Sequence, residues 1–204
     1  MKIGSSLAGQ TTEPEDTNNY KNLIAEIENR ISQLIAAAIF FNNYTGELFD
    51  IYKQNKHRVS AYKLLVCIHN NLYFGYVLRI LKTLFESGHK PKEQSFESWQ
   101  RIRLQSQQNE IQEFDLIKED YKRSPLPKFR DKLEAHKDVN NAGDTVANFL
   151  NPVKREHIKQ AGELLEALKN YVCKYFVEYD FYSFSTLYKP SLDIFIKFVS
   201  ELGN

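Results

Sequence analysis

The sequence predicts an all-α protein, a helical bundle of four long helices with additional short helices, on three observations. Apolar residues recur at three- and four-residue intervals almost throughout the chain, which is the spacing of one face of an α-helix. Glycine and proline are scarce, at 8 and 6 residues, which argues against a turn-rich β protein. With 204 residues, of which 13% are aromatic, the chain can bury a sizeable core in one domain.

The first predicted helix covers residues 18–54, with a bend expected near Gly46. The second follows the sequence "KQNKH" and ends at "ESGHKP", where glycine and proline follow the last helical turn, as they commonly do. Its predicted apolar stripe is Tyr62, Leu65, Val66, His69, Leu72, Tyr73, Tyr76, Ile80 and Leu84. A third helix is expected over residues 95–122, with a polar and solvated middle at "RLQSQQNE".

A short helix is predicted after Pro125 and Pro127, followed by the loop "VNNAGDTVANFLNP". The next helix, over residues 153–177, has the most regular apolar pattern in the chain. Its stripe is Ile158, Ala161, Leu164, Leu165, Leu168, Tyr171, Val172 and Tyr175. Pro190 is expected to open a short final helix, because proline is favoured in a first turn.

These elements suggest three segments. Residues 1–17 are expected to be disordered, residues 18–178 to form the bundle, and the aromatic tail with its short helix, residues 179–204, to pack on an end of that bundle. The alternative for the tail is a partner surface, because exposed clusters of Tyr and Phe mark interfaces.

Charge and cysteine content narrow the class of protein. The net charge is +1, so contact with nucleic acid requires a local basic patch rather than bulk charge. Cys67 and Cys173 lie far apart in apolar helical stretches, and we expect two buried thiols in a reducing compartment. We find no signal peptide and no apolar run long enough to span a membrane, so we expect a cytoplasmic protein.

Several kinds of chemistry find no support in the sequence. It has no GxGxxG, P-loop, HExxH or GxSxG motif, and we predict no cofactor and no metal site. A di-iron bundle needs two ExxH repeats, but Glu86 and His89 form one and Gly88 interrupts it at a helix end. His69 lies on an apolar stripe and is expected to be a hydrogen-bonded core histidine.

One candidate site remains, in the stretch "SPLPKFRDKLEAHKDVNN". In a straight helix Arg130 and His136 lie about 120° apart around the axis and about 9 Å apart along it, so they cannot form a one-face dyad. We expect His136 at the edge of a buried face and Arg130 leaning toward solvent or a partner. In the purely structural alternative, Arg130 pairs with Glu134 and His136 packs beside Leu133.

The longer string "FRDKLEAHKD" resembles the HEPN superfamily of helical bundles, many of which are metal-independent ribonucleases, and its wording is most similar to the AbiU-like abortive-infection branch. The resemblance covers about residues 20–178. It implies that Arg130 and His136 are a catalytic pair oriented by Asp131. In some relatives a Tyr lies two positions after the histidine, but here that position is Asp138, which puts regulation through a modified tyrosine in doubt.

The resemblance further implies a homodimer with one composite cleft, and a toxin or antiphage effector that an antitoxin or regulatory protein controls. RNA cleavage without a metal needs an acid and a base, and imidazole can serve as either. It also needs a cation that stabilises the negative charge of the phosphorane, and arginine can supply it. Six basic residues against two acids over residues 122–137 predict a positive patch in which Lys128, Lys132 and Lys137 hold RNA. Two alternatives remain: a catalytically silent bundle that binds RNA or nucleotides, and a plain helical interaction protein.

Overall fold

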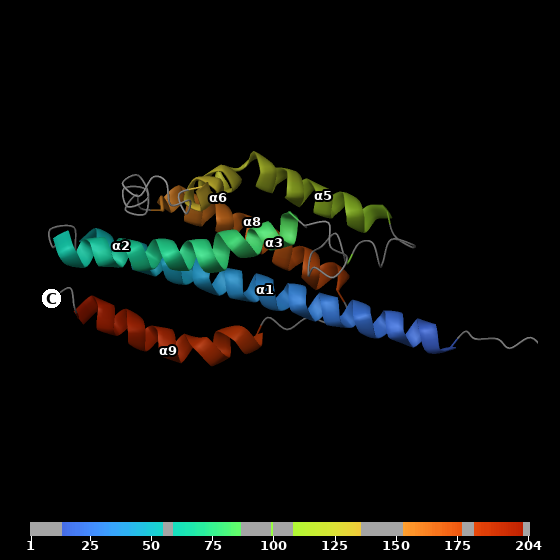
Figure 1. Cartoon of the computed structure of the whole chain (residues 1–204). Coiled ribbons are helices and arrows are strands. Elements are labelled where there is room, and N and C mark those ends of the chain that lie inside the picture. Colours follow the sequence, from blue (N-terminus) through green and yellow to red (C-terminus); the bar gives the residue numbers. More distant parts are fainter. Residues whose placement is uncertain are drawn as a thin grey trace, which may run out of the picture.

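The computed structural model describes residues 14–54, 59–86, 99, 108–135, 153–176 and 182–201 of the chain. Almost all of these residues are helical and none of them lies in a β-strand, which confirms the predicted all-α class (Figure 1). Within the described segments, no helix is long and apolar enough to cross a bilayer.

Helix α1, Pro14–Gln54, is the longest element and forms the centre of the arrangement. Helices α2, α8 and α9 pack along it (Figure 1). α1 begins at Pro14, four residues before the predicted start at residue 18, with the proline in the first turn where its missing N–H costs nothing. It continues through Gly46 as one uninterrupted helix.

The second predicted helix is confirmed over α2 (Val59–Tyr73), η1 (Phe74–Leu78) and α3 (Arg79–Phe85), which follow one another without a break. η1 is a π-helical turn, which is wider than a turn of an α-helix. Tyr76 of this turn, predicted on the buried stripe, is 47% exposed, whereas Ile80 and Leu84, further along the stripe, are buried as predicted. Tyr76 stacks instead on Phe41 of α1, with ring centroids 4.1 Å apart.

Helix α5, Gln108–Arg123, matches the end of the predicted third helix. The start of that prediction lies outside the described residues except for Trp99, which is helical. The short helix α6, Leu126–Ala135, forms where the two prolines predict it.

Helix α8, Arg155–Tyr175, confirms the most regular apolar pattern of the sequence. Its buried residues are Ile158, Ala161, Leu164, Leu165, Leu168, Tyr171 and Val172, and only Tyr175 of the predicted stripe is half-buried. The expectation that Cys173 is buried was wrong, because this residue lies on the outer side of α8 and is exposed.

Helix α9, Tyr182–Glu201, corrects the prediction for the tail. Pro190 does not open a helix but lies inside α9, where it is exposed and removes one donor from the hydrogen-bond ladder. α9 runs along α1, and its Phe195 and Ile196 are partly buried against the core (Figure 1).

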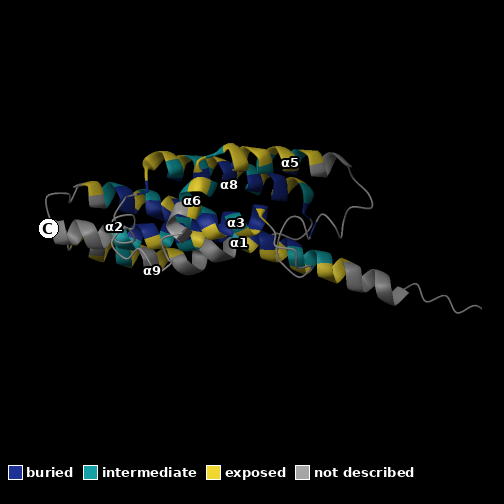
Figure 2. Cartoon of the chain, turned by 45° about the horizontal axis from the view of Figure 1, so that its top comes forward, coloured by how far each residue is buried: buried dark blue, intermediate teal, exposed yellow. Residues whose placement is uncertain are grey.

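The core lies where α1, α2, α3, α5 and α8 face one another, and Figure 2 shows the buried residues on these inner sides. Trp99 is one of its anchors: the indole is 1% exposed, packs on Tyr171 and Phe176 at centroid distances of 6.1 and 4.7 Å, and donates a 2.8 Å hydrogen bond to the buried Glu28. His69 is fully buried with Nε2 2.8 Å from the Thr45 carbonyl oxygen, which confirms the predicted core histidine.

Candidate functional site

The corner between α5 and α6 fixes the start of the candidate motif. The Ser124 hydroxyl donates to the Tyr121 carbonyl at 2.7 Å and accepts the Leu126 N–H at 3.3 Å. The Phe129 N–H donates to the Pro125 carbonyl at 2.9 Å, which closes the first turn of α6. Leu126 is fully buried and anchors this turn in the core, so the backbone that carries the motif is held at both ends of the corner.

We expected Arg130 to lean toward solvent or a partner, but it is buried in the chain, with 5% of its surface exposed. Its guanidinium has three partners. Nε and Nη2 donate to Asp131 Oδ1 at 3.0 and 2.6 Å, and Nη1 donates to Tyr121 Oη at 2.9 Å and to Glu86 Oε1. The physical reason is that α3 ends beside α6 and brings the Glu86 carboxylate to the guanidinium, while α5 brings the Tyr121 phenol. The burial of the guanidinium therefore leaves no donor nitrogen uncompensated.

Tyr121 connects the other two members of this group. Its hydroxyl accepts from Arg130 and donates to Glu86 Oε1 at 3.0 Å. Burial, reinforced by the Glu86 charge, raises the pKa of the phenol, so it remains a neutral donor at any physiological pH. Burial alone would lower the pKa of the Arg130 guanidinium, but hydrogen bonds to Glu86 and Asp131 outweigh it and the pKa is raised.

The charge around Arg130 differs from the predicted positive patch. Two carboxylates and one guanidinium give this group a net charge of −1. Lys122, counted among the six basic residues, is bound to Glu119 at 2.6 Å. Lys128 is exposed at the surface of α6. The patch is therefore weaker over the described residues than the sequence alone suggested.

Part of the predicted site lies outside the described residues. This part comprises His136 and Lys137, which follow α6 directly in sequence, and the side chain of Lys132. The structure brings Arg130 and Asp131 into contact, and it places Lys128 on the same helix.

A second histidine contacts the motif helix. The ring of His157, in the first turn of α8, stacks on Phe129 with centroids 4.3 Å apart. Its Nδ1 accepts the Lys154 N–H at 3.3 Å, as part of the cap of α8. Burial, followed by the nearby Lys154 charge, lowers the pKa of the ring, which keeps the imidazole neutral near pH 7. These contacts indicate that His157 contributes to the packing of α6 on α8.

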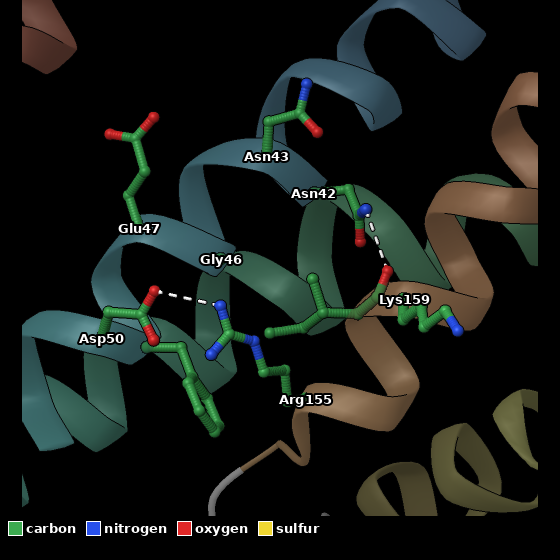
Figure 3. A pocket seen from close by; sticks show the side chains of 9 residues that line it. Asn42, Asn43, Gly46, Glu47, Asp50, Arg155 and Lys159 are labelled. Carbon is green, nitrogen blue, oxygen red and sulfur yellow. Dashed lines mark hydrogen bonds and ion pairs between the residues drawn. The ribbon is translucent and has the colours of Figure 1, made fainter.

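The described surface has pockets away from the six predicted site residues. One of about 340 Å³ lies between α1 and the start of α8, with Asn42, Gly46, Asp50, Arg155, Ile158 and Lys159 among its lining residues (Figure 3). There Asn42 donates to the Ile158 carbonyl at 3.1 Å and Arg155 donates to Asp50 at 3.3 Å. Its acids and bases are balanced, so the lining favours neither an anion nor a cation.

Among the residues that the structure describes, no three His, Cys, Asp or Glu side chains are placed to share a metal ion. Sequence reasoning missed Glu86 and Tyr121 as site residues. They are 44 and 9 positions from Arg130 in the chain, so no helical spacing links them, and only the packing of α3 against α5 and α6 brings them together.

Comparisons of the chain with family models, with curated proteins and with solved structures found no match.

Proposed function

We propose that the chain is a HEPN-like, metal-independent endoribonuclease. The observation that carries the proposal is the fixed guanidinium of Arg130. Asp131, Tyr121 and Glu86 hold this guanidinium in place. Arg130 itself lies on the short helix α6, which His136 follows directly in the sequence. Preorganised cations aimed at developing charge are the largest contributors to catalysis of this type. Together with the "FRDKLEAHKD" string, this supports an arginine held for chemistry.

In the proposed reaction, the 2′-oxygen of RNA attacks the adjacent phosphorus and the 5′-oxygen of the next nucleotide leaves. One imidazole of His136 removes the proton of the 2′-hydroxyl, and a second, protonated, imidazole donates a proton to the leaving oxygen. Arg130 stabilises the charge on the phosphorane, and Asp131 holds the guanidinium in place. The products carry a 2′,3′-cyclic phosphate and a 5′-hydroxyl.

The geometry of α6 explains why two copies are proposed. In a straight helix, residues six positions apart point to different sides, so a one-chain pair of Arg130 and His136 is not expected, whereas residues from two chains can meet across a two-fold axis. Lys128, Lys132 and Lys137 would then hold the phosphate backbone beside the cleft. Within this proposal the protein is a cytoplasmic toxin or antiphage effector of the AbiU-like kind, regulated by an antitoxin or another protein.

A second candidate function, a helical interaction protein without catalysis, has its own support. The Arg130 guanidinium is buried and bound by two carboxylates, which is also the arrangement of an ion pair that only joins helices. In that case α6 only connects α5 to the rest of the bundle, and His136, Lys128, Lys132 and Lys137 have no role in RNA binding or cleavage.

The deciding experiment incubates the purified chain with RNA in the presence of EDTA and compares His136→Ala with His57→Ala, a matched histidine control outside the motif. We expect cleavage with cyclic phosphate ends in the wild type and in His57→Ala. Loss of a general acid or base should reduce the rate of His136→Ala by about 10²–10⁴. The interaction-protein candidate instead predicts no cleavage by any variant, and activity that depends on added magnesium or manganese would contradict the proposed mechanism.

A further inference from the structure

Two buried donors in the Arg130 group converge on a single oxygen atom. Nη1 of Arg130 and the hydroxyl of Tyr121 both donate to Glu86 Oε1, the latter at 3.0 Å, and the two donors lie 2.9 Å apart. Arg130 and Tyr121 are 5% and 2% exposed, whereas 37% of the Glu86 side chain is exposed. A rigid, desolvated pair of donors is therefore covered by a carboxylate that reaches solvent.

The same donor pair suits a phosphate oxygen. A guanidinium binds carboxylates and phosphates with the same planar arrangement of N–H groups, and a phenol hydroxyl donates equally well to either anion. The backbone of Glu86 is fixed at the end of α3, where its N–H donates to the Lys82 carbonyl at 2.7 Å. Its side chain, in contrast, can rotate into water without disturbing this bond.

We propose that Arg130 Nη1 and the Tyr121 hydroxyl form a binding site for a non-bridging oxygen of a phosphodiester, and that Glu86 occupies this site when no RNA is bound. We call it the Arg130–Tyr121 site. The inference rests on the proposed function for its substrate, but the anion site can be tested without RNA. It also adds Glu86 and Tyr121 to the residues that bind substrate or regulate its access.

The charge balance explains why Glu86 has to leave. With both carboxylates in place the group carries a net charge of −1 and repels a phosphate. With Glu86 turned away, Arg130 and Asp131 balance each other, and a phosphate meets two donors that have lost their acceptor. Leaving such buried donors unpaired is costly, so the exchange of one anion for another is favoured over simple loss of Glu86.

Asp131 is less suited to this exchange. Its Oδ1 accepts from both Nε and Nη2 of Arg130, at 3.0 and 2.6 Å, and it is the next residue of the same helix. Releasing it would break two bonds on one edge of the guanidinium. Releasing Glu86 opens the other edge, and the bond from Tyr121 passes to the incoming oxygen.

The test measures binding of inorganic phosphate to the full chain at constant ionic strength, by the NMR signals of the Arg130 guanidinium. Glu86→Gln removes the charge but keeps an acceptor, so folding is preserved, and Glu86→Ala empties the site. The control is Glu119→Gln, which removes one charge from the exposed Glu119–Lys122 pair on α5. We expect Glu86→Gln and Glu86→Ala to bind phosphate on the order of tenfold more tightly than the wild type, because the competing anion is gone.

The gain should disappear in the double variant Glu86→Ala/Tyr121→Phe, which lacks the second donor. Equal binding by the wild type and both Glu86 variants would overturn the inference. An equal gain in Glu119→Gln would overturn it too, because bulk charge would then be the cause.

The two proposals fail separately. Tighter phosphate binding by the Glu86 variants without RNA cleavage by any variant would uphold the Arg130–Tyr121 site and refute the ribonuclease. Cleavage that depends on His136, with unchanged phosphate binding in the Glu86 variants, would uphold the ribonuclease and refute the site.

Discussion

Removal of Arg130 acts on stability as well as on chemistry, because its guanidinium joins three helices. The solvent-facing orientation expected from the sequence would have made Arg130→Ala neutral for folding. In the structure the side chain is buried, and it bonds to residues at the end of α3, on α5 and on α6. A loss of activity in this variant is therefore not by itself a sign of catalysis.

We predict that Arg130→Ala lowers the free energy of unfolding by about 1.5–3 kcal/mol, the usual contribution of hydrogen bonds to a charged group. The loss stays in this range because Glu86 and Asp131 can both reach water. Urea denaturation measures it, with the exposed Arg123→Ala as the control. Leu126→Ala, which removes a fully buried side chain of α6, should cost more, about 2–5 kcal/mol. An unchanged midpoint for Arg130→Ala would contradict the buried ion pair.

His69 makes stability depend on pH. Burial lowers the pKa of its ring, against the opposing effect of hydrogen bonding to Asn70 Oδ1 and to the Thr45 carbonyl oxygen. The unfolded chain takes up a proton near the ordinary pKa of 6.5 while the folded protein resists it, so the unfolded state binds more protons as the pH falls through this region. We therefore expect the contribution of His69 to stability to be complete above about pH 7 and to decrease toward about pH 5.

We predict that His69→Gln, which retains an N–H donor for the Thr45 carbonyl, gives a flatter dependence of the free energy of unfolding on pH than the wild type does. Denaturation series at several pH values measure the slope. Parallel slopes for the two proteins would show that His69 does not contribute to the pH dependence.

At the scale of elements, two helical glycines provide a matched pair. A Cβ atom at Gly75, in the π turn, would meet no heavy atom within 4 Å. A Cβ at Gly162 of α8 would lie 3.1 Å from Asn42 Nδ2, the group that bonds to the Ile158 carbonyl. The first glycine is therefore replaceable by alanine, while the second leaves room for a hydrogen bond between α1 and α8.

We predict that Gly75→Ala raises the free energy of unfolding by about 0.5–1 kcal/mol, the usual advantage of alanine in a helix interior. Gly162→Ala should gain less or lose stability, because the Asn42 amide has to shift. Thermal denaturation of both variants tests this, and a larger gain for Gly162→Ala would contradict the described contact of α1 with α8.

The elements were predictable where local pattern decides the structure. The stripe of α8 recurs without interruption, and its burial follows from spacing alone. The π turn at Phe74–Leu78 carries no such signal, and Tyr76 of this turn, predicted to be buried, is half exposed although it stacks on Phe41 of α1. Pro190 was misplaced for a related reason, because its position inside α9 is tolerated only where the helix side is exposed, and exposure is a property of the packed molecule.

At the scale of the whole molecule, the candidate site was predictable only in part. The contact of Arg130 with Asp131 joins neighbours in sequence, so spacing could suggest it. The contacts with Glu86 and Tyr121 depend on how three helices pack. A count of charges along residues 122–137 omits Glu86 for this reason, because this carboxylate lies at the end of a distant helix.

The proposed function requires a particular assembly. We predict a homodimer whose two-fold axis passes near α6, with about 1,200–2,000 Å² of surface buried in total, as is usual for specific interfaces. Light scattering at tens of micromolar, with and without RNA, measures the mass. A monomer under both conditions would argue against the composite cleft.

The burial of Trp99 gives the protein its own optical probe. It is the only tryptophan in the sequence, so the emission of the whole chain above the tyrosine range comes from one indole enclosed by Tyr171, Phe176 and the Glu28 carboxylate. In this dry setting its fluorescence should be blue-shifted and shielded from acrylamide, and should move to the red when α1 and α8 separate. The unfolding of every variant described above can thus be followed by the intrinsic fluorescence of this single tryptophan, without any label.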